Sequence, residues 1–158
     1  GAVTANYVSA QSFLVEGNRV TGARVRDERD GEAFDVRASV VVNAAGAWAD
    51  RVAQLAGLAG LGIRPFRRTA LTVAAPAGID IRDWPNMIDV DEEFYFKPEA
   101  GHILISPADE TPSEPCDAQP EEFDVALGVD RFERATGMEI RRVQQRWAGL
   151  RTFGTALA

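Results

Sequence analysis

The chain has 158 residues, of which 46% are hydrophobic and 26% charged, and its formal net charge at pH 7 is −7. This length allows a buried core and is typical of one domain, whereas the acidic charge argues against nucleic-acid binding, which needs a clustered basic face. A single cysteine and a single histidine exclude an internal disulfide and argue against a metal site. No apolar run reaches the ~20 residues that cross a bilayer, so we expect a cytoplasmic protein or one associated with a membrane surface.

The first third of the chain is predicted to form an antiparallel meander without a helix of its own. Extended segments are expected over residues 6–15, 19–28 and 34–37. A turn at residues 16–18 connects the first two. The pair Asp30-Gly31 is a strong hairpin signal and connects the second to the third.

A different kind of strand is predicted over residues 39–44. The run Val40-Val41-Val42 is typical of a strand buried on both faces of a parallel sheet. The small residues Ala44-Ala45-Gly46 follow it, and either close backbone packing or a bound non-protein group would account for their lack of side chains. A short helix is expected next, over residues 48–56, with Gly57 as its stop.

The glycines at positions 57, 60 and 62 are interpreted as part of a connector. A dinucleotide-binding loop follows a strand and begins a helix, so that N–H groups at the helix end face the pyrophosphate. Here the predicted helix comes before the glycines and a strand follows them. No nucleotide fingerprint is therefore expected in this segment.

The rest of the chain combines short strands with one longer helix. The segments expected to be extended are residues 63–73, 87–90, 93–97, 102–106 and 138–153. A polar, proline-rich loop over residues 107–120 precedes a helix over residues 120–136, for which Pro120 is a suitable first residue and Gly137 a stop. The predicted fold class is therefore mixed α/β.

Arg68, Arg151 and Tyr95 are the candidate ligand-binding side chains. An arginine normally lies in solvent, but these two stand among apolar and small residues, where a lone cation is costly unless it meets an anion. Two arginines that converge from distant segments suit a carboxylate. Tyr95 lies between Phe94 and Phe96, so alternation turns it to the opposite face, where its phenol bonds either a backbone carbonyl or a ligand oxygen.

Four motifs, in this order along the chain, resemble the FAD-dependent D-amino acid oxidase family, which includes glycine oxidase, sarcosine oxidase and the D-amino acid dehydrogenases. They are Val41-Val-Asn-Ala-Ala-Gly-Ala-Trp48, Arg67-Arg68-Thr69, Phe94-Tyr95-x-Lys97-Pro98 and Trp147-Ala-Gly-Leu-Arg-Thr-Phe153. From Val40 onward the resemblance is to the D-arginine dehydrogenase branch. The residues before it are similar to the glycerol-3-phosphate dehydrogenase branch.

The resemblance implies a middle fragment of a longer flavoprotein. Residues 1–62 correspond to part of the FAD-binding domain and include a β-meander and the buried parallel strand. Residues 63–146 correspond to a substrate-binding domain, made of a mixed β-sheet and the helix over residues 120–136. Residues 147–158 correspond to a strand that returns to the FAD domain. FAD is the implied cofactor, and the loop that binds its pyrophosphate lies outside this segment.

The resemblance also implies which residues contact the ligands. The cofactor-binding residues are Ala10, Ala44, Ala45 and Gly46. The substrate's α-carboxylate is implied to lie against Arg68, Tyr95 and Arg151, and its side chain against Asn86 and Ile88. Asn86 stands where the D-arginine branch is expected to have methionine, so the resemblance does not extend to a preference for arginine. No catalytic base and no metal ligand is implied for this segment.

The implied reaction is oxidation of the Cα–N bond of a D-amino acid, with hydride transfer to flavin N5 and hydrolysis of the imine to a 2-oxo acid and ammonia. One alternative is a related flavoprotein that acts on glycerol 3-phosphate or on a secondary amine such as sarcosine. The other is a folded module that is not catalytic by itself. The expected partner is a small-molecule substrate, and the sequence leaves the oligomeric state open.

Overall fold

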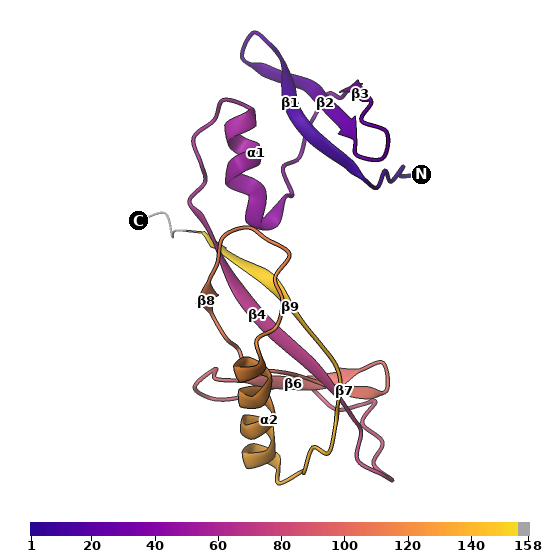
Figure 1. Ribbon diagram of the computed structural model, residues 1–158, viewed down its shortest axis with the longest axis vertical. Helices are drawn as coiled ribbons and strands as arrows, with labels where there is room; N and C mark the ends of the chain where they lie inside the picture. Colours follow the sequence, from indigo (N-terminus) through magenta and orange to yellow (C-terminus); the bar gives the residue numbers. More distant parts are fainter. Residues whose placement is uncertain (155–158) are drawn as a thin grey trace. The chain divides into compact units, whose positions relative to one another are not determined.

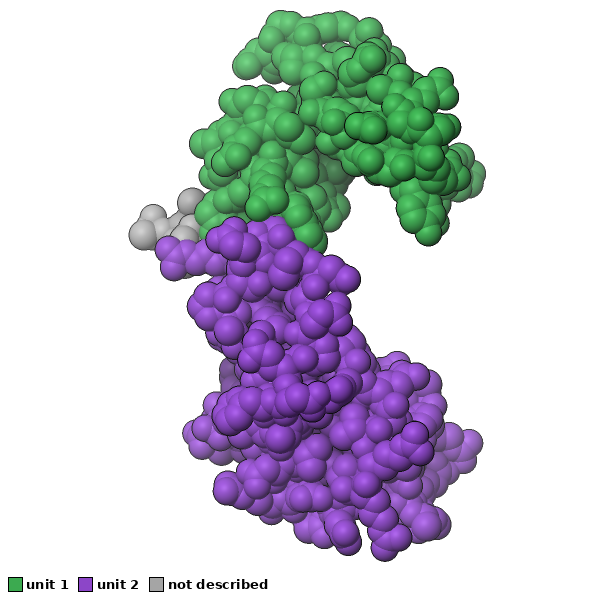
Figure 2. All heavy atoms as spheres, viewed as in Figure 1, with its two compact units in different colours: residues 1–63, 154–158 green, residues 64–153 purple. Residues whose placement is uncertain are grey.

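The computed structural model describes residues 1–154. It divides into two compact units, which are coloured separately in Figure 2. Unit 1 contains Gly1–Ile63, and Gly154 also belongs to it; unit 2 contains Arg64–Phe153. Within the described residues, no helix is long and apolar enough to cross a membrane.

Unit 1 begins with the predicted antiparallel meander. Its strands are β1 (Val8–Glu16), β2 (Arg19–Asp27) and β3 (Ala33–Arg37), and they form a sheet in that order (Figure 1). Both pairings are antiparallel, since short turns join neighbouring strands. The prediction of a meander is therefore confirmed.

The strand predicted over residues 39–44 is not formed. Residues 40–45 have no regular secondary structure, and the side chains of Val40 and Val42 are 72% and 78% exposed. A parallel strand needs a neighbour to accept and donate its backbone hydrogen bonds. Among residues 1–154 no strand lies beside this segment, so the prediction of a buried parallel strand is wrong for the chain as described.

The predicted short helix is present in two parts, a 3₁₀ turn η1 (Gly46–Trp48) and the helix α1 (Ala49–Leu55). Asp50, in the first turn of α1, accepts the backbone N–H of Leu61 at 2.9 Å and that of Gly62 at 3.1 Å. These N–H groups are therefore bonded within the chain rather than left free for a phosphate. The interpretation of this glycine-rich segment as a connector is confirmed.

Unit 2 is built around one sheet (Figure 1). Its strands are β4 (Ile63–Ala74), β5 (Met87–Ile88), β6 (Tyr95–Glu99), β7 (His102–Ser106), β8 (Thr111–Pro112) and β9 (Val143–Gly154). The order is β5-β6-β7-β4-β8, and β9 also pairs with β4. The pairings β4–β7, β4–β8, β5–β6 and β6–β7 are antiparallel, where a mixed sheet was predicted. Short connections account for the antiparallel pairs β5–β6 and β6–β7, whose strands are consecutive in the chain.

The helix α2 (Glu122–Thr136) covers one face of this sheet and begins two residues later than predicted. Its Phe132 is 1% exposed and packs edge-to-face on Phe96 at a centroid distance of 5.1 Å. A Cβ atom on Gly128 would lie 3.0 Å from Cδ2 of Leu71, so this glycine lets the helix approach β4 closely. Gly137 ends the helix in the left-handed conformation, as its type predicts.

Candidate functional site

The two faces of β4 have different surroundings. Leu71 and Val73 belong to the core that includes Phe132 of α2. Since successive residues of a strand point to opposite faces, Arg68 and Thr72 point away from the helix. We call this second surface of the unit 2 sheet the open face.

Tyr95 and Ile88 lie on the open face too. Phe96 of β6 pairs with Ile105 of β7, and both belong to the core under α2. Tyr95 precedes Phe96 and therefore points the other way. Ile88 of β5 pairs with Tyr95 and shares its face, where its side chain is 61% exposed. The prediction that Phe94 and Phe96 share one face and Tyr95 takes the other is confirmed, because both phenylalanines are buried in that core.

Arg151 reaches the same surface from β9. The rings of Phe66 and Phe153 meet edge-to-face, with their centroids 5.4 Å apart. The Arg151 guanidinium carbon lies 5.5 Å from the centroid of the Phe153 ring. Alternation puts Phe66 on the same face as Arg68, so the contact between the two rings also places Arg151 there.

A hollow of about 600 Å³ supports this alignment of β4 and β9. Thr72 of β4 and Trp147 of β9 both line it. Phe66 lies six residues before Thr72 and contacts Phe153, which lies six residues after Trp147. The two strands therefore run antiparallel, and Arg68 and Arg151 lie between these two contacts. The structure thus brings Arg68, Arg151, Tyr95 and Ile88 to one face. Asn86, exposed in the irregular segment before β5, is two residues from Ile88.

Arg68 is largely enclosed. Its side chain is 14% exposed, and its Nη2 donates to Oε1 of Glu110 at 2.7 Å. Its Nε is buried and finds no hydrogen-bond partner among the described residues. Sequence reasoning missed Glu110, because the segment from 107 to 120 reads as a polar loop. The strand β8 lies in this segment, but it has only two residues and one of them is Pro112, so the sequence gives little sign of a strand there.

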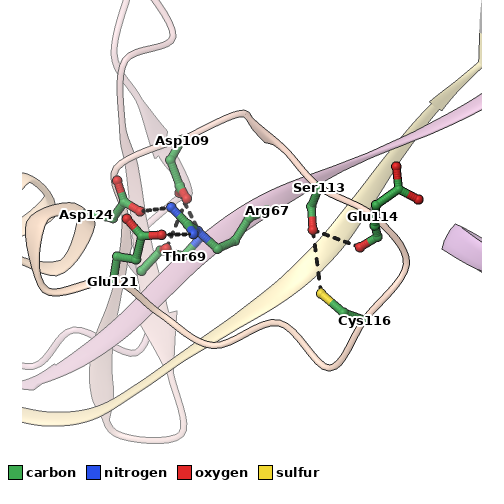
Figure 3. Close-up of polar contacts among 8 residues, drawn as sticks. All are labelled: Arg67, Thr69, Asp109, Ser113, Glu114, Cys116, Glu121 and Asp124. Carbon is green, nitrogen blue, oxygen red and sulfur yellow. Dashed lines mark hydrogen bonds and ion pairs between the residues drawn. The ribbon is translucent and has the colours of Figure 1, made fainter.

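The neighbouring Arg67 has a structural environment instead (Figure 3). It points toward α2, where its Nη2 donates to Oδ2 of Asp124 at 2.8 Å and its Nη1 pairs with Glu121. The hydrogen bond with Glu121, followed by that with Asp124, raises the pKa of Arg67, while burial opposes the shift. Asp124 is 6% exposed. Arg67 therefore joins the start of α2 to β4, and only Arg68 of this pair faces the open surface.

The predicted cofactor-binding residues lie in unit 1. Ala44 and Gly46 are exposed and Ala45 is half-buried. Asn43 shapes this turn, since its Nδ2 donates to the carbonyl of Ala49 at 2.9 Å and its Oδ1 accepts the N–H of Ala45 at 3.3 Å. Gly46 has a φ of 53°, and a Cβ there would meet no atom within 4 Å.

This turn fits a flat cofactor, because residues 44–46 carry no side chain larger than a methyl group and the space beside Gly46 is open. Ala10 is also exposed, but it lies on β1 opposite Val25 rather than in the turn. Within residues 1–154, no group of three or more histidine, cysteine, aspartate or glutamate side chains is arranged to hold a metal ion.

The family described as "DAO: FAD dependent oxidoreductase" matches residues 1–157. The chain belongs to this family of FAD-dependent oxidoreductases, and the prediction of FAD as the cofactor is confirmed.

Curated relatives include proteins named for glycerol phosphate. The chain is 27% identical over 171 residues to alpha-glycerophosphate oxidase of Streptococcus pneumoniae, which covers 96% of this chain and 26% of that protein. It is 46% identical over 50 residues to probable glycerol-3-phosphate dehydrogenase of Encephalitozoon cuniculi, which covers 32% of this chain and 8% of that protein. The chain thus spans about a quarter or less of the length of these relatives.

Solved structures show the same fold. L-proline dehydrogenase from P. horikoshii matches with a TM-score of 0.70 and 23% identity, over 91% of this chain and 37% of that one. Glycine oxidase from Geobacillus kaustophilus matches with a TM-score of 0.69 and 21% identity, over 95% of this chain and 37% of that one. Glycerol-3-phosphate dehydrogenase from Bacillus halodurans, complexed with FAD, matches with a TM-score of 0.68 and 20% identity, over 94% of this chain and 31% of that one. The predicted fold class is confirmed.

Proposed function

We propose that this chain is the middle part of a FAD-dependent oxidoreductase that oxidises the Cα–N bond of a D-amino acid. The observation that carries the proposal is the presence of Arg68, Arg151 and Tyr95 on the same open face. Two guanidinium groups offer paired N–H donors to a carboxylate, and a phenol adds a third donor. All three residues belong to unit 2.

The proposal assigns FAD binding and substrate binding to different parts of the chain. Residues 1–62 contribute to the FAD-binding domain, residues 63–146 form most of the substrate-binding domain, and residues 147–158 return to the FAD domain. The two compact units, with their boundary between Ile63 and Arg64, support this division. The uncovered turn from Ala44 to Gly46 supports contact with FAD in the first part.

The chain's own residues would bind and orient the substrate. Arg68 and Arg151 would hold its α-carboxylate, and the Tyr95 hydroxyl would donate a hydrogen bond to the same group. Asn86 and Ile88 would contact its side chain. Bound FAD would supply the two-electron oxidation as acceptor of the Cα hydride. Loss of an N–H proton from the substrate would complete the imine, which water would hydrolyse to a 2-oxo acid and ammonia. Fixing the substrate in one orientation is the protein's contribution to the rate.

A second candidate is oxidation of glycerol 3-phosphate. It is favoured by alpha-glycerophosphate oxidase of Streptococcus pneumoniae, whose similarity extends over 96% of this chain. Arginine also binds phosphate, so two arginines on one face suit either substrate. A secondary amine such as sarcosine remains a third substrate class, and a module that is inactive by itself remains the alternative outside enzymes. A cytoplasmic or membrane-associated location stays a prediction.

A substrate panel tests the proposal. The complete, flavin-loaded protein that contains this chain would be given single D-amino acids, their L-enantiomers, sarcosine and glycerol 3-phosphate, with an artificial electron acceptor. We expect turnover with at least one D-amino acid and formation of the matching 2-oxo acid. Turnover of glycerol 3-phosphate alone would contradict the proposal in favour of the second candidate. The same assay with the 158-residue chain by itself tests the non-catalytic alternative, for which no turnover of any substrate is expected.

A further inference from the structure

Glu110 is the side chain of unit 2 that contacts the proposed carboxylate site without belonging to it. The β8 register explains its position: Phe66 pairs with Pro112 and Arg67 with Thr111, so the next pair along the two strands is Arg68 and Glu110. Side chains of such a cross-strand pair lie on one face of the sheet. Glu110 therefore stands on the open face, 2.7 Å from Nη2 of Arg68.

The backbone around Glu110 is anchored to β4. Asp109 accepts the backbone N–H of Thr69 at 2.7 Å and its hydroxyl at 3.0 Å (Figure 3). The hydroxyl of Ser106 donates to the carbonyl of Thr69 at 2.7 Å, and it also accepts the N–H of Ala108 at 3.3 Å. Glu110 is thus held against Arg68 by contacts on both sides of the turn.

The charges on this part of the open face add up to a single positive charge. Arg68 and Arg151 contribute one positive charge each, and Glu110 contributes one negative charge. Lys97 and Glu99, which also lie on this face, cancel each other at 2.6 Å. The remaining cation of β4 on this face is Arg64. Four residues of strand place its backbone about 13 Å from Arg68, and it is exposed, so salt screens it.

We propose that Glu110 makes this site selective for a monoanionic carboxylate over a phosphate dianion. This inference rests on the carboxylate site proposed above. A ligand with one negative charge leaves the group of Arg68, Arg151 and Glu110 neutral. A dianion leaves one uncompensated negative charge beside the Glu110 carboxylate, which is a like-charge contact in a partly enclosed place.

The contact does not close the site to a carboxylate. It joins one nitrogen of Arg68 to one oxygen of Glu110, and a guanidinium has five N–H donors in all. Glu110 therefore leaves donors for a ligand while it offsets part of the positive charge. Its own side chain is 53% exposed, so the Glu110 carboxylate is in contact with water.

The test compares binding of two small probes, propionate and methyl phosphate, to the complete flavin-loaded protein by isothermal titration calorimetry. At pH 8 methyl phosphate is mostly a dianion, because the second pKa of a phosphate monoester is about 6. Glu110→Gln removes the charge and keeps an oxygen that can accept the Arg68 N–H. Glu114→Gln is the matched control, since it makes the same change of net charge at an exposed position of the same loop.

We expect the unchanged protein to bind propionate more tightly than methyl phosphate. Glu110→Gln should shift the ratio of the two dissociation constants toward methyl phosphate by about tenfold, and Glu114→Gln should leave it unchanged. An unchanged ratio in Glu110→Gln, or a preference of the unchanged protein for methyl phosphate, would overturn the inference. Arg68→Ala distinguishes a failure of the proposed carboxylate site from a failure of the role given to Glu110. If Arg68→Ala does not weaken propionate binding, the proposed carboxylate site itself is wrong. If it does and only the Glu110→Gln ratio stays constant, Glu110 alone was misassigned.

Discussion

Phe66 of β4 and Phe153 of β9 meet edge-to-face at a centroid distance of 5.4 Å. The two rings stand two residues before Arg68 and two residues after Arg151, respectively. Their contact therefore sets both arginines on the face of the sheet that α2 leaves uncovered. An arginine pair far apart in sequence becomes, through this one contact, a candidate site for an anion.

The first prediction concerns these two arginines. Arg68→Ala and Arg151→Ala should each lower kcat/KM for the preferred D-amino acid by roughly 100-fold, or about 3 kcal/mol, because each removes a charge-paired contact to the carboxylate. Steady-state kinetics of the complete protein measure this. Arg37→Ala is the control, since Arg37 forms an exposed pair with Glu16 in unit 1. Normal activity in both site variants would rule out the carboxylate assignment.

The second prediction concerns the hydroxyl of Tyr95. Tyr95→Phe keeps the ring in its half-buried place on β6 and removes only one donor. We expect substrate binding to weaken by about 1 kcal/mol, or roughly fivefold, which is the usual net value of one hydrogen bond. Tyr7→Phe, at a 71% exposed position of unit 1, should change nothing. Equal substrate affinity in Tyr95→Phe would show that the phenol does not reach the ligand.

The third prediction concerns the buried pair of Arg67 and Asp124. Arg67→Met should lower the free energy of unfolding by about 3 kcal/mol, because it leaves a carboxylate with an 8% exposed side chain without its partner. Adding Asp124→Leu should restore most of that loss, since no buried charge remains. Urea denaturation measures both.

Arg24→Met is the control for this pair. Its partner Asp35 has a 40% exposed side chain, so water can replace the lost contact and the cost should stay below about 1 kcal/mol. If Arg67→Met were no more destabilising than Arg24→Met, the contact between α2 and β4 through Arg67 would be unimportant for stability.

The fourth prediction concerns the pH dependence of Asp27 at the end of β2. The side-chain hydrogen bond from Arg29, together with the backbone N–H of Arg29, lowers the pKa of Asp27 from 3.8 to about 2. Because the folded pKa lies below the ordinary value, the stabilising contact is fully present above pH 3.8 and is lost as the pH falls toward 2. A carboxyl ¹³C titration should find a midpoint near 2 in the original chain. Arg29→Gln should move this midpoint toward 3.8, and an unchanged midpoint would argue against the Arg29 contact as its cause.

Local patterns predicted several elements correctly. Hairpin and turn signals predicted the meander of β1, β2 and β3, and a proline, acidic residues and a closing glycine predicted α2. The alternation of Phe94, Tyr95 and Phe96 predicted that Tyr95 takes the opposite face from the two phenylalanines. Each of these signals depends on residues within a few positions of one another, so the sequence displays them directly.

The errors arose where distant segments decide the outcome. Val40-Val41-Val42 has the composition of a buried strand, but a strand forms only beside a neighbour, and the described residues provide none there. Arg67 and Arg68 have the same side chain in adjacent positions. Alternation sends one to Asp124 of α2 and the other to Glu110, and neither partner can be recognised from the segment around the arginines.

The amino-acid sequence alone determined the family, its FAD cofactor and the mixed α/β fold class, because motifs and periodicity are local properties of the chain. Only the tertiary structure decided that Arg68, Arg151 and Tyr95 share one face and that Glu110 neutralises one of the two charges there. The reason is that strand order and register bring together β4, β6, β8 and β9, and the contact between Arg68 and Glu110 alone joins residues 42 positions apart. The residues around an arginine in the sequence therefore do not predict which carboxylate it will pair with.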